Sequence, residues 1–388
     1  MPVSSLLQTP PPWAEDGQDG DWAVLASHCT LARNFSDFVF PARCNEGELC
    51  AVAARVRAAV ESALAGLAAA PQTSDTLETQ ALAERWLATA AWAALPDRAR
   101  GLHLSPSQDL SVLTNAGDHL LLRASVPGNR LEDAWARVSR TDDALAAVLN
   151  YACDDRLGFL TSRLDMAGTG LRAGVLLHLP ALAACDGLGG LVRELHTRRL
   201  ALAPAALGNP PEQGAALRTR GGQFCLTAAE IEPLHAQCLL CTEDGVCSGS
   251  GTTAPGDLYV LHNTDALGVP EEELVLRVGH AARQAAGLEE QARQTLAHDR
   301  ERLEDRVARA LALARGARLL GFREGLALLS TLRVGRALEL IPGAAPGRMA
   351  RALAETQAAH LCLARGAGRT ALSVAAARAR YFQELLSE

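Results

Sequence analysis

Four cysteines in the second half of the chain have a spacing compatible with metal binding. Cys225, Cys238, Cys241 and Cys247 follow the pattern C-x12-C-x2-C-x5-C, and His235 lies among them. Four thiolates can hold a structural Zn²⁺ ion in tetrahedral geometry, and the segment around them is polar and rich in glycine. The same spacing also fits a redox pair or cysteines that bind nothing. The sequence leaves these three alternatives open.

Arginine is the only permanently charged basic residue in the chain. The 388 residues include 37 arginines and no lysine. A Walker-type phosphate loop, the strand lysine of eukaryotic-type protein kinases and any Schiff-base mechanism all need a lysine. These classes are therefore excluded, and any bound anion must be held by guanidinium groups, backbone N–H groups or histidines.

The elements that would position such residues are indicated by hydrophobic periodicity. Apolar residues recur every three to four positions over 46–95 and 130–153, which predicts helices. Short apolar or alternating runs bounded by glycine, asparagine or proline predict strands at 110–115, 119–126, 157–164 and 172–179. We therefore expect an α+β fold in which helices flank a mostly antiparallel sheet.

The pattern divides the chain into three parts. Residues 1–100 should form a small, mostly helical N-terminal part, and residues 101–270 an α+β domain that contains the irregular, cysteine-bearing segment 201–257. Beyond Pro270 the helical period continues, so residues 271–388 should form a helical C-terminal domain.

Charge and hydropathy limit the partners of the chain. Residues 271–388 carry 18 arginines against 14 acidic residues, interleaved as on a solvated helical surface, so we expect no nucleic-acid binding. An uncharged apolar run of about 18 residues is missing, as is a basic and apolar leader at the start. We expect a soluble, cytoplasmic protein with no membrane partner.

Five blocks occur in the order that a known family shows. They are LARNFSDFVFP (31–41), NAGDHLLLR (115–123), LGFLTSRLDMAGTGLRAGVLLHLPAL (157–182), LYVLHNTDALG (258–268) and REGLALLSTLRVGRALELIP (323–342). Together they resemble the ATP:guanidino phosphotransferases, or phosphagen kinases, and most closely the bacterial protein-arginine kinases. The resemblance spans nearly the whole chain except 201–257. It implies the guanidino kinase fold and a helical C-terminal domain capable of forming a homodimer.

The family's catalytic carboxylates are replaced in this sequence. Phosphoryl transfer from ATP to a guanidinium needs a carboxylate that orients the attacking nitrogen and accepts its proton. The family motif NEEDH reads Asn115-Ala116-Gly117-Asp118-His119 here, so both glutamates are lost. Asp118 is displaced by one or two positions, and a shift of one residue on a strand turns a side chain to the other face. Ala116 and Gly117 thus mark substituted catalytic positions, with Asn115 and Asp118 as remnants.

A second catalytic position carries the wrong charge for the family's substrate. The family motif TACPTNVGTG becomes TSRLDMAGTG over 161–170, which puts Arg163 where the resemblance implies a cysteine beside the substrate guanidinium. Two like charges in a desolvated pocket should oppose arginine binding by several kcal/mol.

The family's phosphate cradle is also depleted. The motif SSRIRLARN reads ASHCTLARN over 26–34, so His28 and Thr30 replace two phosphate-binding arginines. The arginine that follows DH in the family is Leu121, and Arg123 lies two residues on, with its side chain on the same strand face. Arg123 is therefore a candidate replacement.

Other nucleotide and ligand positions are retained or displaced. Arg172 in the GTGLRAG stretch is kept, His119 persists near the expected nucleotide, and Arg220, with Arg218, is the remaining candidate for the family's RGxYGEG loop. Near the C-terminus, an RDxxRA-type element that receives phosphoarginine in the family retains Arg369 alone.

Residues that build the fold match the family, whereas residues that do the chemistry are replaced. This pattern favours a catalytically degenerate protein-arginine kinase homologue, a pseudokinase with a binding or regulatory role and a protein partner. ATP and Mg²⁺ binding should be weak or lost, because several charged contacts are missing. Two alternatives stay open: an active ATP-dependent protein-arginine kinase that uses Arg123, Arg172, Arg220 and a displaced carboxylate, and a zinc-containing interaction module on a kinase-derived fold.

Overall fold

An eight-stranded antiparallel sheet forms the centre of the computed structural model, which describes residues 3–15, 22–70, 73–205, 218–220, 223–225, 254–341 and 346–387. In spatial order its strands are β2 (Ala68–Ala69), β3 (Gly101–Leu104), β4 (Leu110–Thr114), β5 (Leu120–Pro127), β1 (Val24–Arg33), β8 (Leu171–His178), β12 (Leu258–Asn263) and β9 (Leu200–Pro204). The expected α+β fold with an antiparallel sheet is therefore confirmed. Two short hairpins lie outside it: β6 (Cys153–Asp154) with β7 (Gly158–Phe159), and β10 (Arg218–Arg220) with β11 (Gln223–Cys225).

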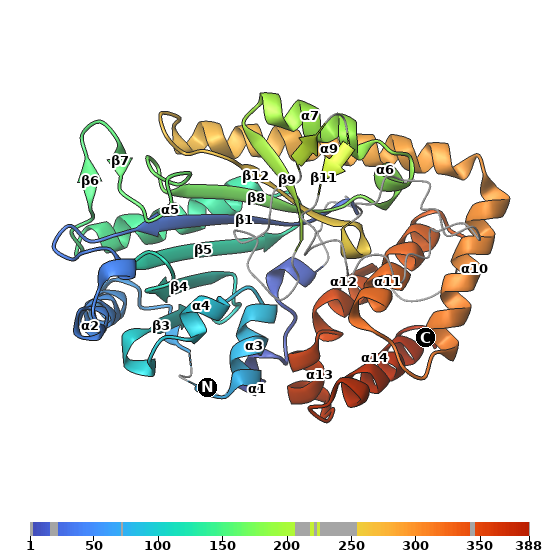
Figure 1. Cartoon of the computed structure of the whole chain (residues 1–388), viewed down its shortest axis with the longest axis horizontal. Helices are drawn as coiled ribbons and strands as arrows, with labels where there is room; N and C mark the ends of the chain where they lie inside the picture. The colour runs from blue at the N-terminus through green and yellow to red at the C-terminus, as the bar shows by residue number, and fades with distance from the viewer. Residues whose placement is uncertain are drawn as a thin grey trace.

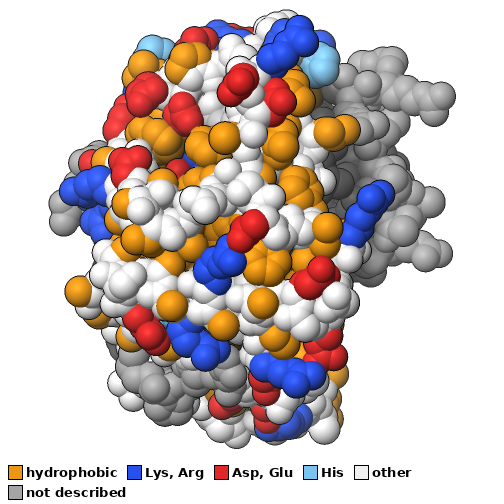
Figure 2. All heavy atoms as spheres, turned by 90° about the vertical axis from the view of Figure 1, so that its left-hand side faces the viewer, with side chains coloured by type: hydrophobic (Ala, Val, Ile, Leu, Met, Phe, Trp, Pro, Cys, Tyr) orange, Lys and Arg blue, Asp and Glu red, His pale blue; other side chains and the backbone are white. Residues whose placement is uncertain are grey.

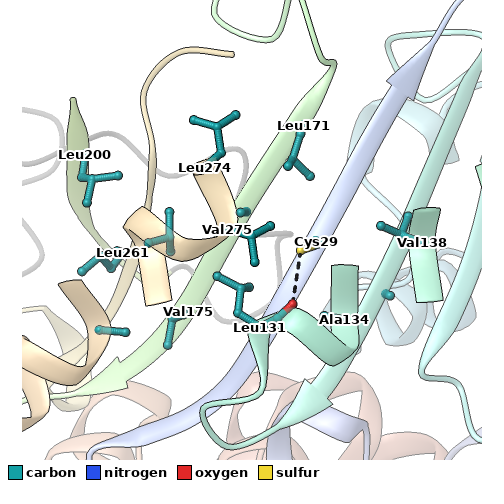
Figure 3. Close-up of a cluster of buried hydrophobic side chains, with 14 of the residues drawn as sticks. Cys29, Leu131, Ala134, Val138, Leu171, Val175, Leu200, Leu261, Leu274 and Val275 are labelled. Carbon is teal, nitrogen blue, oxygen red and sulfur yellow. Dashed lines mark hydrogen bonds between the residues drawn. The ribbon is translucent and has the colours of Figure 1, made fainter. Parts of the chain in front are cut away.

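One face of the sheet is covered by helices that join it in a single apolar core. These helices are α2 (Glu46–Ala63), α5 (Leu131–Ala146), α6 (Pro180–Ala184), α7 (Leu188–Thr197) and the long α9 (Glu271–Ala297). Cys29, Leu171 and Val175 from the strands point at Leu131 of α5 and Val275 of α9 (Figure 3). Because alternate strand residues face opposite sides, the intervening positions of β1 and β8 face away from this core.

The other face is covered by the C-terminal helices and by the N-terminal segment. Packed there are α10 (Arg300–Gly316), α11 (Phe322–Ala337), α12 (Pro346–Glu355) and α14 (Ala371–Leu385), together with the 3-10 turn η1 (Pro12–Ala14). A third cluster joins α1 (Val3–Leu6), α3 (Thr76–Glu84), α4 (Ala90–Ala93) and α13 (Ala358–Arg365) to β3 and β4. In Figure 1 these helices lie below the sheet, with α10–α14 at the right. Further 3-10 turns are η2 (Pro41–Arg43), η3 (Asp97–Ala99) and η5 (Pro255–Asp257).

Three sequence-based expectations are changed by the structure. The helix expected to run to residue 153 ends at Ala146. The strand expected over 157–164 is limited to Gly158–Phe159, because Gly158 and Gly168 take left-handed φ angles of 74° and 110° and fold the segment back on itself. The central strand β1 was missed, since all ten of its residues are buried and none of the usual alternation marks it.

The boundaries near residues 100 and 270 stay predictions. The sheet takes β1 from the first of the expected parts, and α9 of the last part packs on the same core as the sheet. Within the described residues, no helix is long and apolar enough to cross a membrane.

Candidate functional site

The family's phosphate-cradle positions lie side by side on the sheet face that points away from α5 and α9. The antiparallel register places Thr30 of β1 opposite both Arg123 of β5 and Arg172 of β8. Paired residues share a face, so these three side chains form a row across three strands. His28 pairs with Gly174, and a Cβ on that glycine would lie only 2.5 Å from His28 Nε2. The imidazole therefore fills space that a side chain at position 174 would need.

Arg172, the retained arginine of the cradle, is buried and held by three polar groups. Its Nη1 donates to the backbone oxygen of Asn263 at 2.8 Å and lies 2.9 Å from Nδ1 of His262. Its Nη2 donates to Oδ2 of Asp165 at 2.5 Å. Because Arg172 is only 4% exposed, this ion pair is shielded from solvent on the arginine side.

Asp165 binds a second arginine at the same time. Arg163 donates from Nε to Oδ1 at 3.0 Å and from Nη2 to Oδ2 at 2.7 Å. Burial opposes ionisation of the carboxyl, but the hydrogen bonds from Arg163 and the charge of Arg172 outweigh it and hold the pKa of Asp165 at about 2. The carboxylate is therefore charged at neutral pH, between the intruding arginine and the retained one.

Two tryptophans cover the other end of the row. Arg123 donates from Nη1 to the backbone oxygen of Trp86, and its Nε lies 3.4 Å from Oγ1 of Thr30. The Trp86 ring stacks on Trp13 at a centroid distance of 4.8 Å and meets His28 edge-on at 6.1 Å. The cavity that these side chains line has a volume of about 20 Å³, enough for one or two water molecules.

The turn between β4 and β5 carries the substituted catalytic positions. Gly117 adopts a φ of 100°, and Ala116 beside it offers no polar side-chain atom. Oδ1 of Asp118 accepts hydrogen bonds from Nδ2 of Asn34 and from the backbone N–H of Ser162, both at 2.6 Å. Asp118 is only 4% exposed. Through its bond to Ser162, the buried carboxylate links the turn to the segment that carries Arg163.

The two other residues retained in this turn also hold the backbone in place. Asn115 donates from Nδ2 to the backbone oxygens of Leu49 and Ala99, at 3.0 and 2.6 Å. His119 accepts a hydrogen bond at Nδ1 from the backbone N–H of Phe35 and stacks on the Phe35 ring, and burial lowers the pKa of its imidazole. Their retention thus has a structural explanation.

Comparison with known proteins places these residues in a family. Residues 51–206 match the family described as ATP:guanido phosphotransferase, C-terminal catalytic domain, and residues 300–388 match the protein-arginine kinase McsB C-terminal domain. The chain is 32% identical over 361 residues to a protein-arginine kinase from Symbiobacterium thermophilum, which covers 89% of this chain and 87% of the relative. The chain belongs to the protein-arginine kinase family.

Further relatives extend the match to both ends of the chain. A protein-arginine kinase from Moorella thermoacetica is 29% identical over 391 residues, which covers 99% of this chain and all of the relative (100%). Among solved structures, a lombricine kinase aligns with a TM-score of 0.51 at 20% identity, covering 71% of this chain and 68% of that chain. This structural likeness confirms the guanidino kinase fold.

Asp165 is the site residue that sequence reasoning missed. The protein-arginine kinase pattern TACPTN has a threonine at this position, so the change to an acid was visible in the aligned blocks. Its contact with Arg172 could not be read from the block, because it depends on how the loop with Gly168 and Gly170 turns back toward β8. Trp13 and Trp86 left no comparable signal, because their contact depends on packing between segments 73 residues apart.

Arg369, the retained arginine of the family's phosphoarginine-binding element, forms an ion pair. Arg369 of the protein-arginine kinase C-terminal region donates from Nη2 to Oδ2 of Asp75 at 3.1 Å. The arginine side chain is 66% exposed. Phosphoarginine binding at this position stays a prediction.

Several predicted ligands lie beyond what the structure describes. Arg220 is in β10 and Cys225 in β11, each described by its backbone alone, and Cys238, Cys241 and Cys247 fall outside the described residues. In the described part of the chain, no three His, Cys, Asp or Glu side chains are grouped to hold a metal. The zinc prediction therefore has no support from this part.

Proposed function

We propose that this chain is a protein-arginine kinase homologue that has lost phosphotransfer and acts by binding a protein partner. The observation that carries the proposal is the ion pair between Asp165 and Arg172. The carboxylate at 2.5 Å occupies a donor of Arg172 and offsets part of the positive charge that would hold a polyphosphate, and it repels phosphate oxygens that approach.

The residues on the cradle face do not fit a nucleoside triphosphate with its Mg²⁺ ion. The family is ATP-dependent, as the description of its catalytic domain says. Here the cavity lined by His28, Arg123 and the two tryptophans is about 20 Å³, far smaller than a drug-sized ligand pocket of several hundred Å³. The described residues of this face therefore offer no cradle for phosphoryl transfer from ATP.

The positions that would bind the substrate guanidinium independently support the loss of phosphotransfer. Proton transfer from a guanidinium needs a carboxylate within hydrogen-bond reach, and the only acid of the β4–β5 turn, Asp118, already accepts two short hydrogen bonds. Arg163 carries a positive charge where the family's substrate guanidinium would lie, but it is 49% exposed and paired with Asp165, so the repulsion is weaker than in the desolvated pocket expected from the sequence. An arginine substrate is thus disfavoured by both charge and chemistry.

Exposed apolar side chains around this site support a protein as the partner. Leu164, next to Arg163, is 92% exposed, and Leu157 between β6 and β7 is 48% exposed. On the end of the molecule that carries β6, β7 and α2, hydrophobic side chains lie among charged groups of both signs (Figure 2). Mixed apolar and charged surface of this kind suits a protein partner better than a highly charged polymer. A second copy of this chain is one such partner.

The alternative, an active protein-arginine kinase, is favoured by the retained Arg172 and by the row that it forms with Arg123. In that case Arg220 and a displaced carboxylate would complete the site. Relatives at about 30% identity carry this activity in their names.

One experiment separates the two functions. The purified chain and the Symbiobacterium thermophilum relative are incubated side by side with Mg-ATP and an unfolded protein substrate, and acid-labile phosphoarginine is measured. We expect product from the relative only, and no heat of ATP binding to this chain at millimolar ATP. Phosphoarginine formation that disappears in the Arg172→Ala variant would establish the active kinase instead.

A further inference from the structure

A small cavity beside the cradle row is lined by buried hydrogen-bond donors that have no acceptor. Arg85, Trp86 and Ser125 all line this cavity of about 20 Å³. Nη1 of Arg85, Nε1 of Trp86 and Oγ of Ser125 are buried and have no hydrogen-bond partner among the described residues. The exposed fractions of the three residues are 4%, 2% and 9%. Buried polar groups are nearly always satisfied, so three unpaired groups around one cavity point to a missing ligand.

Arg85 brings a positive charge to this cavity without a carboxylate to balance it. Its Nε donates to Oε1 of Gln108 at 2.8 Å and its Nη2 to the backbone oxygen of Thr9 at 2.7 Å, and both acceptors are neutral. No acidic side chain of the described residues lies within ion-pair distance, although the charge of Glu355 acts on Arg85 from further away. Burial lowers the pKa of Arg85 to about 10, which leaves the guanidinium charged at neutral pH. A buried charge without a counter-ion is costly.

Among the described residues, Asp109 is the acid that lines the cavity, and its carboxylate is already neutralised. Oδ1 of Asp109 accepts hydrogen bonds from Ser105 at 2.7 Å and Ser107 at 2.6 Å, and Oδ2 forms an ion pair with Arg137. The local charge balance at Arg85 therefore stays positive.

We propose that this cavity binds a small inorganic anion of the size of chloride. An anion accepts hydrogen bonds from a guanidinium, an indole and a hydroxyl together, and it supplies the missing negative charge. Water accepts at most two such bonds and brings no charge, and a nucleotide is excluded by the volume. Two cradle positions, His28 and Arg123, also line the cavity, but the three donors Arg85, Trp86 and Ser125 lie outside the blocks that match the family. The inference is independent of whether the chain transfers phosphate.

The test measures thermal unfolding of the full chain while sodium chloride replaces sodium gluconate at constant ionic strength. We expect the unfolding temperature to rise with chloride and then level off, as for any ligand that binds the folded state alone. Trp86→Phe and Ser125→Ala each remove one donor and should raise the chloride midpoint about tenfold. Crystals grown in sodium bromide should show an anomalous peak inside the cavity.

A matched tryptophan elsewhere supplies the control. Trp92 is also buried, but its Nε1 donates to the backbone oxygen of Thr114 at 3.0 Å and does not line the cavity. Trp92→Phe should lower stability without moving the chloride midpoint. Equal stability in chloride and gluconate, or an equal midpoint shift in Trp92→Phe and Trp86→Phe, would overturn the proposal and leave water as the occupant. Neither result bears on phosphoarginine formation, so this inference and the proposed function fail separately.

Discussion

Asp165 Oδ2 and Arg172 Nη2 lie 2.5 Å apart, although one residue is in a loop and the other is in the central sheet. The loop is turned toward the strand by Gly168 and Gly170, whose φ angles of 110° and 70° are positive and favour glycine. The carboxylate of Asp165 is therefore positioned by the same segment that leads into β8. An internal counter-ion of this kind is always present and competes with any phosphate that approaches Arg172.

Restoring the family residue at position 165 should release Arg172. In Asp165→Thr, the guanidinium loses its charged partner and the site loses a repulsive carboxylate. One charge-assisted hydrogen bond is worth about 1.5–3 kcal/mol, so we expect ATP affinity to rise at least tenfold in calorimetric titrations. Asp265→Thr is the matched control, because it removes an acid paired with the exposed Arg199 and should leave ATP binding unchanged. An unaltered heat of binding in Asp165→Thr would show that the tryptophan cover, and not the ion pair, closes the cradle.

The retained Arg33 should prove essential for stability and irrelevant to nucleotide affinity. It pairs with Asp142 at 2.6 Å, donates to the backbone oxygen of Thr169 at 2.8 Å, and is only 2% exposed. Arg33→Met leaves the buried carboxylate of Asp142 without its cation. We therefore expect the free energy of unfolding, measured in urea, to fall by about 3–5 kcal/mol. The exposed pair of Arg309 with Asp305 gives the comparison, and Arg309→Met should cost about 1 kcal/mol or less. Similar losses in both variants would contradict a structural role for Arg33.

Much of the fold was predictable because the burial of one face of a strand or helix produces a periodic hydrophobic pattern in the sequence. The strands β4, β5 and β8 follow the predicted runs closely, and α2, α5 and α9 begin where the helical runs begin, although α2 and α5 end well before those runs do. Strand β1 gave no such pattern, because all its residues from Val24 to Arg33 are buried and polar residues such as His28 and Thr30 interrupt its apolar run. A strand of this kind cannot be told from other short buried segments by periodicity alone.

The residues of the site could be predicted from the sequence, but the side chains that surround them could not. The blocks aligned with the family named His28, Thr30, Arg123 and Arg172, and the register does bring them onto one face. What surrounds them follows from contacts between segments distant in the chain, such as the stacking of Trp13 on Trp86. Sequence spacing carries no information about such contacts.

Two glycines with similar φ angles should differ in how much stability is lost on substitution by alanine. Gly168 has a φ of 110°, and a Cβ there would lie 2.5 Å from the backbone oxygen of Ala266. Gly117 has a φ of 100° with open space around it. Gly117→Ala should therefore show the cost of backbone strain alone, about 1–3 kcal/mol, and Gly168→Ala a clearly larger loss in chemical denaturation. Equal losses would mean that the 168 loop shifts freely and does not fix Asp165 in place.

The buried carboxyl of Glu289 should make stability depend on pH. It lies on α9 and accepts hydrogen bonds from the backbone N–H groups of Ala181 and Leu182, at 3.0 and 2.8 Å. Burial outweighs these bonds and raises the pKa of Glu289 from its ordinary 4.5 to about 7. Between these two pH values the folded chain holds a proton that the unfolded chain has released, so this stabilisation is complete below pH 4.5 and is lost as the pH rises through 7.

The difference between the wild type and Glu289→Gln isolates this effect, because the buried histidines titrate in both proteins. We expect the free energy of unfolding of the wild type, relative to Glu289→Gln, to be on the order of 3 kcal/mol higher at pH 5 than at pH 8. Urea unfolding at the two pH values measures it. A difference that is constant with pH, or that grows toward pH 8, would mean that the two N–H donors keep the carboxylate charged in the folded chain.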